Sequence, residues 1–388
     1  MIQIENKERC CGCTSCVSIC PHGAITMRAD GLGFLYPEVD KDLCMDCGLC
    51  DKVCAFDENY DKSSNLPDPD IYAVRHKKIS EVETSRSGAM FVALSDYVLE
   101  NGGVVYGAGY TRHFRVTHKR ALSKEERDEF KGSKYVQSFL GDTFKNVCDD
   151  LRKGMIVMFS GTPCQTSGLR SLVNLKRVPS DRLYVCDIVC HGVPGPRLWE
   201  DYLNYLERKE GKRVLRVDFR DKRRFGWKAH KESFELEGGY YTCTYTYTYL
   251  FYQHIMFRHS CAVCPFTNYI RPSDITIADY WGWERLDKNL NTDDRGVSLV
   301  LVNSAKGQDW FERVKKDIDY VRSDKEKCWQ PHLSKPSEMH PNREAFEQDY
   351  KLHGFEYVMR RYGNIGWHYW MRRVMNKIRR MVRKGFVR

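Results

Sequence analysis

Eight cysteines near the start of the chain have the spacing of iron-sulfur ligands. They form two runs, Cys10-x-x-Cys13-x-x-Cys16-x-x-x-Cys20 and Cys44-x-x-Cys47-x-x-Cys50-x-x-x-Cys54. Three closely spaced thiolates can bind one cluster, while the fourth, which follows after three intervening residues, reaches another. The two runs therefore predict two [4Fe-4S] clusters with crossed ligands. The first set is Cys10, Cys13, Cys16 and Cys54; the second set is Cys44, Cys47, Cys50 and Cys20.

Two other uses of these cysteines are disfavoured. Structural zinc prefers two separated Cys-x-x-Cys pairs, and disulfides are disfavoured in a chain without an export signal. Short strands are predicted at 24–27 and 33–36 about an Asp30-Gly31 turn. Together these features resemble the bacterial two-cluster ferredoxin module over residues 1–58. The departures are Ala55, where the second motif usually has proline, and Cys11, a surplus thiol.

The composition is that of a globular protein with two or three domains, since the chain has 388 residues and is 42% hydrophobic. No apolar run approaches the ~20 residues of a membrane span, and residues 1–10 lack the pattern of a signal peptide. The 17 cysteines then indicate a reducing compartment and metal ligation. We expect a cytoplasmic protein.

The body of the chain, 71–340, is predicted to follow a polar linker at 59–70 and to have an α/β fold. Strands are expected at 104–109, 155–159, 183–189, 274–279 and 297–303. Helices are expected at 89–100, in the segment that follows Gln165 and runs through Leu175, and at 308–320. The alternating segment Thr242 to Tyr249 predicts one more strand.

Small-residue loops in this body suit a phosphate group. Ser87-Gly88 precedes a helix, with Ser87 as its expected N-cap, and Gly161-Thr162 follows a buried strand. A third loop is Lys131-Gly132-Ser133-Lys134-Tyr135. Each loop alone is weak evidence for a phosphate site, because a serine before a helix most often does no more than cap that helix.

Four further cysteines could form a third metal site. Cys164 and Cys190 follow two successive strands, and Cys261-x-x-Cys264 lies further along. Ligands gather at the carboxyl ends of strands in open α/β sheets, so we expect Cys164 and Cys190 at one edge. A third [4Fe-4S] cluster, a zinc ion, a redox dithiol and unligated thiols all remain open. The remaining cysteines are predicted to be small buried hydrophobes: Cys148, Cys186, Cys243 and Cys328.

The ordered set of motifs resembles a known family, the beta subunits of coenzyme F420 hydrogenases and dehydrogenases. The likeness covers most of residues 1–335. The motifs that carry it are Lys131 to Tyr135, Gly161-Thr162-Pro163-Cys164-Gln165, Cys190-His191-Gly192, Cys261-x-x-Cys264, and Ser273-Asp274-Ile275 through Tyr280-Trp281-Gly282.

The resemblance implies FAD in the α/β body, a cluster beside it, and electron exchange with a hydride carrier such as coenzyme F420 or another substrate. It makes Cys164, Cys190, Cys261 and Cys264 candidate ligands of that cluster. The candidate FAD-binding residues are Ser87, Gly88, Gly132, Ser133, Lys134, Tyr135, Gly161 and Thr162. No catalytic acid or base is named; His191 is only a neighbour of the site. The alternative is an electron-relay or scaffold protein that has clusters but no flavin.

Charge is unevenly distributed along the chain. Residues 1–60 hold 10 acidic and 5 basic side chains, whereas 372–388 hold 8 basic and no acidic ones. We expect an acidic cluster module that works with a redox partner, such as ferredoxin or an electron-donating subunit.

The segment 341–388 is predicted to be a basic helical tail. Its apolar stripe consists of Trp367, Trp370, Met371, Val374, Met375, Ile378, Met381 and Val382. The helix could dock on its own body or lie on an anionic membrane at the inner face, and no nucleic acid is expected.

Overall fold

A computed structural model describes residues 2–57, 61–367, 369–371 and 373–375. In the N-terminal module, β1 (Ile25–Ala29) pairs antiparallel with β2 (Leu35–Val39), between the short helices α1 (Ser15–Ile19) and α2 (Leu49–Lys52). Both helices begin after a residue with positive φ, Thr14 at 65° and Gly48 at 69°. The backbone thus turns sharply inside each cysteine run. The predicted hairpin is confirmed.

The body is built on a mixed eight-stranded sheet with the order β13-β3-β12-β11-β7-β6-β4-β5. The central strands β4, β6, β7 and β11 are parallel, and the outer pairs are antiparallel. The strands are β3 (Asp70–His76), β4 (Val104–Tyr110), β5 (Val116–Ala121), β6 (Val157–Gly161), β7 (Leu183–Ile188), β11 (Ile275–Asp279), β12 (Ser298–Val302) and β13 (Ile318–Ser323). The predicted α/β body is confirmed as a mixed α/β sheet with helices.

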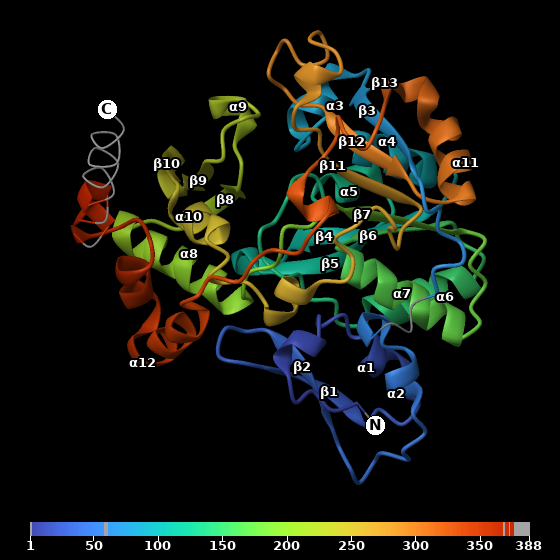
Figure 1. Ribbon diagram of the computed structural model, residues 1–388, viewed down its shortest axis with the longest axis horizontal. Helices are drawn as coiled ribbons and strands as arrows, with labels where there is room; N and C mark the ends of the chain where they lie inside the picture. The colour runs from blue at the N-terminus through green and yellow to red at the C-terminus, as the bar shows by residue number, and fades with distance from the viewer. Residues whose placement is uncertain (1, 58–60, 368, 372, 376–388) are drawn as a thin grey trace, which may run out of the picture.

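Helices cover both faces of this sheet. On one face, α4 (Met90–Glu100) and α11 (Ala305–Val314) share a core with the strands. On the other, α6 (Thr143–Arg152) and α7 (Pro163–Leu175) pack between the sheet and the N-terminal module, whose Ile19 and Ile25 join that core. Figure 1 shows the module below α6 and α7. Two short helices, α3 (Ile79–Thr84) and α5 (Lys124–Asp128), complete this part.

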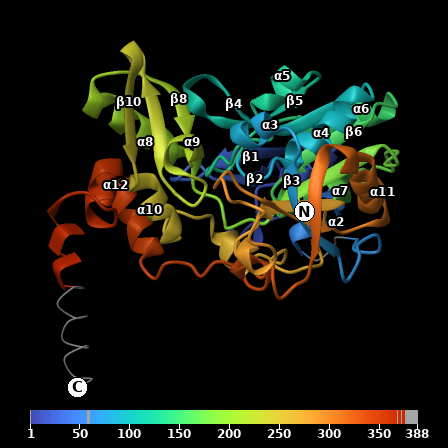
Figure 2. The ribbon, with the colours of Figure 1, turned by 90° about the horizontal axis from the view of Figure 1, so that it is seen from above.

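A second core surrounds a smaller antiparallel sheet of β8 (Val214–Asp218), β9 (Glu232–Leu236) and β10 (Tyr240–Thr244). It is covered by α8 (Pro196–Glu210), α10 (Thr246–Tyr252) and α12 (Arg343–Arg361), with α9 (Lys222–Phe225) after β8. Figure 2 shows this group beside the large sheet. Leu32 and Phe34 of the N-terminal hairpin are fully buried in the same core, which holds the module against α8 and α12.

The strand predicted from Thr242 to Tyr249 is wrong in its second half, where the chain forms α10. The cause is the fully buried carboxylate of Glu232. It accepts hydrogen bonds from the backbone nitrogens of Tyr247 (2.8 Å) and Thr248 (2.9 Å) at the start of the helix. A carboxylate at this end of a helix satisfies free N–H groups and favours the helix dipole.

Three other local predictions need correction. Ser87 is not the N-cap of α4, which is Ala89; the Ser87 hydroxyl donates instead to the Val297 carbonyl at 2.5 Å. The helix predicted at 308–320 ends at Val314; a 3-10 turn at Lys315–Asp317 follows, and Ile318 then begins β13 at the sheet edge. Cys243 is exposed, whereas Cys148, Cys186 and Cys328 are buried as predicted. The tail is predicted at 341–388; its first part forms α12, which packs in the second core, and its end, 376–388, lies outside the described residues.

Candidate redox site

The first predicted set of thiols converges in the folded chain. Burial raises the pKa of Cys16 well above the ordinary value, and the neighbouring thiols of Cys13, Cys10 and Cys54 raise it further. Cys54 comes from the second run, so the crossing of the two runs is a feature of the fold. The second set also converges, around a cavity of about 20 Å³ whose lining includes all its members: Cys20, Cys44, Cys47 and Cys50.

The third group of thiols converges from three separate parts of the chain. Cys164 lies in the first turn of α7 after β6, Cys190 follows β7, and Cys261 and Cys264 belong to a 3-10 turn at 259–263 and its end. The thiols of Cys261, Cys164 and Cys264 all raise the pKa of Cys190, in addition to burial. Burial likewise raises the pKa of Cys261 and of Cys264 to about 12.

Within the described residues, no three or more His, Cys, Asp or Glu side chains are arranged to hold a single metal ion. This finding concerns single ions, whereas the four thiolates of a cube each bind a different iron atom and stand further apart. No disulfide joins the cysteines, all of which are free thiols. The donor set in each of the three groups, four thiols, fits a [4Fe-4S] cluster.

Cys11, the surplus thiol, joins the first group to the third. Its thiol is buried and shares hydrogen bonds with Cys13 and Cys164. The hydrogen bond from Cys11 lowers the pKa of Cys13 to about 6, and another lowers the pKa of Cys164. Cys11 therefore lies next to a thiol of the first group and a thiol of the third.

A cavity of about 330 Å³ lies at the carboxyl ends of β6, β7 and β11, and Cys164 and Cys190 form part of its wall. Its volume is in the range of small-molecule sites. Seven of the eight predicted flavin-binding residues line it: Ser87, Gly132, Ser133, Lys134, Tyr135, Gly161 and Thr162. Gly88 lies outside the lining. A Cβ there would stand 2.2 Å from the Val74 carbonyl oxygen, which explains the glycine by close packing of α4's entry against β3.

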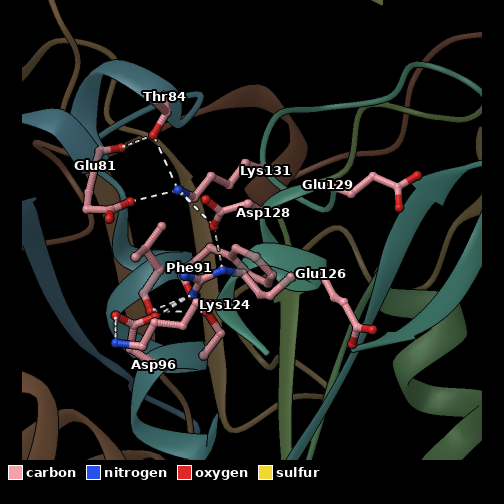
Figure 3. A network of polar contacts seen from close by, with 12 residues as sticks. Glu81, Thr84, Phe91, Asp96, Lys124, Glu126, Asp128, Glu129 and Lys131 are labelled. Carbon is pink, nitrogen blue, oxygen red and sulfur yellow. Dashed lines mark hydrogen bonds and ion pairs between the residues drawn. The ribbon is translucent and has the colours of Figure 1, made fainter. Parts of the chain in front are cut away.

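The ammonium groups of the lysines beside this cavity are bound to other groups of the protein. The Lys134 ammonium donates to the carbonyls of Glu129 (2.7 Å), Lys131 (3.1 Å) and Gly132 (3.3 Å), and burial lowers its pKa to about 7. Lys131 is held by Glu81 at 2.7 Å and Asp128 at 2.9 Å (Figure 3). The ammonium groups of both lysines are thus engaged within the protein and shape the loop, although both residues line the cavity together with Gly132 and Ser133.

Arginines supply positive charge to the cavity wall, and the sequence motifs did not reveal them. Arg86 and Arg220 both line the cavity; Arg220 is buried and Arg86 is half-buried. Neither Nε has a hydrogen-bond partner among the described residues, but Arg220 is paired with Asp279 through Nη1. The Nη2 of Arg86 donates to the Trp227 carbonyl at 3.4 Å. Arg86 stands between Ser85 and Ser87, and proximity to the predicted loop was the one available signal.

A polar chain follows the opposite wall. The Gln165 amide donates to the Ser138 hydroxyl, which lies 3.0 Å from Nδ1 of His118, and Nε2 of His118 lies 3.0 Å from the Ser160 carbonyl. Burial lowers the pKa of His118 to about 4, so the ring is neutral at pH 7. A neutral ring donates through Nε2 to the carbonyl and accepts at Nδ1. This chain orients the segment 160–165.

His191, the predicted neighbour of the site, is also neutral. Burial, with His332 nearby, lowers the pKa of His191 to about 3. Its Nε2 lies 3.0 Å from Nε2 of His254, and the rings of His191 and His332 are 3.9 Å apart. The group packs against the aromatic wall formed by Phe251 and Phe257.

Comparison with known proteins agrees with this layout. Residues 154–326 match the model of the C terminus of the coenzyme F420 hydrogenase/dehydrogenase beta subunit, and residues 9–57 match the 4Fe-4S dicluster domain. The resemblance found in the sequence is thereby confirmed.

Individual proteins are similar to this chain either over a short segment or in structure at low sequence identity. The chain is similar to the A subunit of the H(2):CoB-CoM heterodisulfide,ferredoxin reductase from Methanothermobacter marburgensis (35% identity) and M. thermautotrophicus (33%). Each match covers 14% of this chain and 11% of the relative, so the chain spans about a tenth of their length. A chain of the F420-reducing [NiFe] hydrogenase complex from Methanosarcina barkeri matches with 16% identity and a TM-score of 0.49, over 74% of this chain and 94% of that chain.

Proposed function

From a chain that joins a 4Fe-4S dicluster domain to the C-terminal region of the coenzyme F420 hydrogenase/dehydrogenase beta subunit family, we propose an iron-sulfur flavoprotein oxidoreductase. It exchanges single electrons through three [4Fe-4S] clusters and hydride with coenzyme F420 or another carrier at FAD. One observation carries the proposal: Cys164 and Cys190 belong to a convergent group of four thiols and also form part of the wall of the 330 Å³ cavity. A cluster and a cofactor would therefore lie side by side.

The convergent thiol groups are the proposed cluster ligands. Cys10, Cys13, Cys16 and Cys54 hold the first cluster, Cys20, Cys44, Cys47 and Cys50 the second, and Cys164, Cys190, Cys261 and Cys264 the third. The ligands of the third cluster come from three separate segments of the body, so its assembly would link α7, the end of β7 and the turn at 259–263.

The cavity residues are the proposed flavin-binding groups. Small residues at Gly132, Ser133 and Gly161 leave the backbone open to a ligand, and the unpartnered Nε of Arg86 suits the negative charge of a pyrophosphate. FAD, when bound, takes up two electrons as hydride and passes them on singly, which is the conversion that clusters require. Hydride transfer needs no proton donor, in keeping with the neutral His118 and His191 at the cavity.

The partner that supplies or receives single electrons would dock at the second cluster. Cys47 is exposed, and beside it the side chain of Met45 is 71% exposed. Leu43 is 51% exposed on the same loop. The second cluster would lie close to solvent and be surrounded by exposed apolar residues, which suits the transient docking of a redox protein.

The test is the composition and spectrum of protein purified without oxygen. We expect about 12 iron atoms per chain, together with a flavin absorption band and one FAD released on denaturation. Reduction by a hydride donor should bleach the flavin band and the cluster absorption together. About 8 iron atoms and no FAD would instead favour the electron-relay protein without flavin.

The tail carries a separate proposal, binding to an anionic membrane surface. Within the described residues no helix is both long and apolar enough to cross a membrane. Trp367 is 63% exposed, Trp370 66%, and Met371 and Met375 are also exposed. Exposed aromatic and apolar residues in a basic segment suit the surface of anionic lipid, where each basic residue adds about 1 kcal/mol.

Liposome sedimentation at low salt tests this proposal. The full chain should pellet with anionic vesicles and stay in solution with neutral ones, and deletion of residues 367–388 should abolish pelleting. Equal recovery of both forms in the supernatant would contradict membrane binding and favour docking of the tail on its own body.

A further inference from the structure

A buried arginine stands where the N-terminal module meets the body. Arg258 is fully buried and comes three residues before Cys261, a member of the third group. Its guanidinium nevertheless extends into the module and reaches the first group. There its Nη2 lies 3.5 Å from the Cys10 sulfur, and its Nε donates to the Cys10 carbonyl at 2.7 Å. Arg258 therefore joins a loop of the third group to a ligand of the first.

The remaining donors of Arg258 are also satisfied. Nη1 donates to Oε1 of Gln137 at 3.0 Å, and Nη2 donates to the Leu35 carbonyl at 2.8 Å. The guanidinium lies over the Tyr36 ring, 4.2 Å from its centroid. Space is left for it by Gly12, where a Cβ would stand 2.8 Å from Nη1. The side chain is thus held in one orientation by three segments, 10–12, 35–36 and Gln137.

Its charge has no carboxylate partner. Within the described residues no Asp or Glu lies within ion-pair distance of the Arg258 guanidinium; the carboxylates of this region are engaged elsewhere, Asp30 by Lys7 and Glu347 by Arg343. A buried cation is costly unless it is paired. Arg258 does touch the sulfur of Cys10, which becomes a negatively charged thiolate when it binds a cluster, so the cluster would supply the missing partner of the charge.

We infer that Arg258 is the counter-charge of the first cluster, and that it makes this cluster the electron relay between the module and the third cluster. The inference rests on the proposed function, because it requires the clusters. Electrons pass singly, one cluster being oxidised as the other is reduced. Cys11, which contacts both Cys13 and Cys164, lies at the same junction. The second cluster, at the exposed Cys47, is then the entry point for the partner.

The sign of the effect on the first cluster follows from electrostatics. An added electron increases the negative charge of the cluster, and a buried cation next to a ligand stabilises that charge in a medium of low dielectric. Removing the cation should lower the reduction potential. An expected change of about tenfold in the reduction equilibrium corresponds to about 59 mV for one electron.

The test is a redox titration of the whole holoprotein followed by electron paramagnetic resonance. In Arg258→Gln, with iron content unchanged, one cluster should titrate at a potential at least about 59 mV lower. The shifted signal should be the one that Cys13→Ser removes. Arg258→Lys, which keeps the charge, should restore most of the potential. The matched control is Arg28→Gln, which removes an exposed cation of the same module, paired with Glu38, and should shift nothing.

A second variant tests the inference in case Arg258→Gln loses iron. Gln137→Glu places a carboxylate against Nη1 of Arg258 and should lower the same potential while Arg258 keeps its place. Fully loaded variants with unchanged potentials, or an equal shift in Arg28→Gln, would overturn the inference and leave the proposed function intact. Wild-type protein without three clusters would overturn the proposed function itself.

Discussion

Serine in place of any one of Cys164, Cys190, Cys261 and Cys264 should lower the iron content by the same amount, from about 12 to about 8 atoms per chain. The reason is the convergence of these four thiols around Cys190. A cube that lacks one ligand is labile, so each substitution should have the effect of removing the whole cluster. Iron and acid-labile sulfide analysis of anaerobically purified variants measures this.

The matched control is Cys148→Ser, at a thiol buried in α6 and outside the three groups, which should keep all the iron. Cys13→Ser should remove one N-terminal cluster and leave FAD in place. Unequal losses among the four substitutions, or zinc in the purified protein, would contradict a shared third cluster. Loss of FAD from Cys13→Ser would contradict the separation of the first group from the cavity.

Arg86→Gln should weaken FAD binding by about tenfold to hundredfold, because a hydrogen bond to a charged group contributes about 1.5–3 kcal/mol. Arg86 lines the cavity, its Nε lacks a partner among the described residues and, unlike Arg220, it is in no ion pair there, so it has a donor to offer to a phosphate oxygen. The measurement is titration of flavin-depleted protein with FAD, followed by quenching of flavin fluorescence. Iron content should not change.

Arg75→Gln is the control for loss of a partly buried arginine. Arg75 donates to the Leu290 carbonyl at 3.2 Å and pairs with Asp293, and it does not line the cavity. FAD affinity should match the wild type in this variant. Equal weakening in both variants would indicate a general loss of stability, and unchanged affinity in Arg86→Gln would remove Arg86 from the flavin site.

Patterns that depend on neighbouring residues predicted much of the fold. The central strands β4, β6, β7 and β11 lie within three residues of the segments expected, because buried parallel strands form continuous apolar runs. Prediction failed where a distant residue decides the local structure. The alternation after Thr242 favours a strand, yet the carboxylate of Glu232, ten residues earlier, stabilises α10. Ser87 resembles a helix cap, yet its hydroxyl binds Val297, more than two hundred residues away.

The sequence by itself determined which cysteines group in the module, since their short spacing limits which thiols can reach one cluster. It also pointed to the loops at Gly132 and Gly161, because small residues mark places where the backbone can approach a ligand closely. Tertiary structure alone decided how these parts meet. The contact of Cys11 with Cys164, the reach of Arg258 to Cys10, and the unpartnered Nε of Arg86 among the described residues all depend on segments far apart in the chain. An arginine, or a cysteine outside a spaced motif such as Cys11, carries no local signal of its partners, because burial and charge pairing depend on packing between elements.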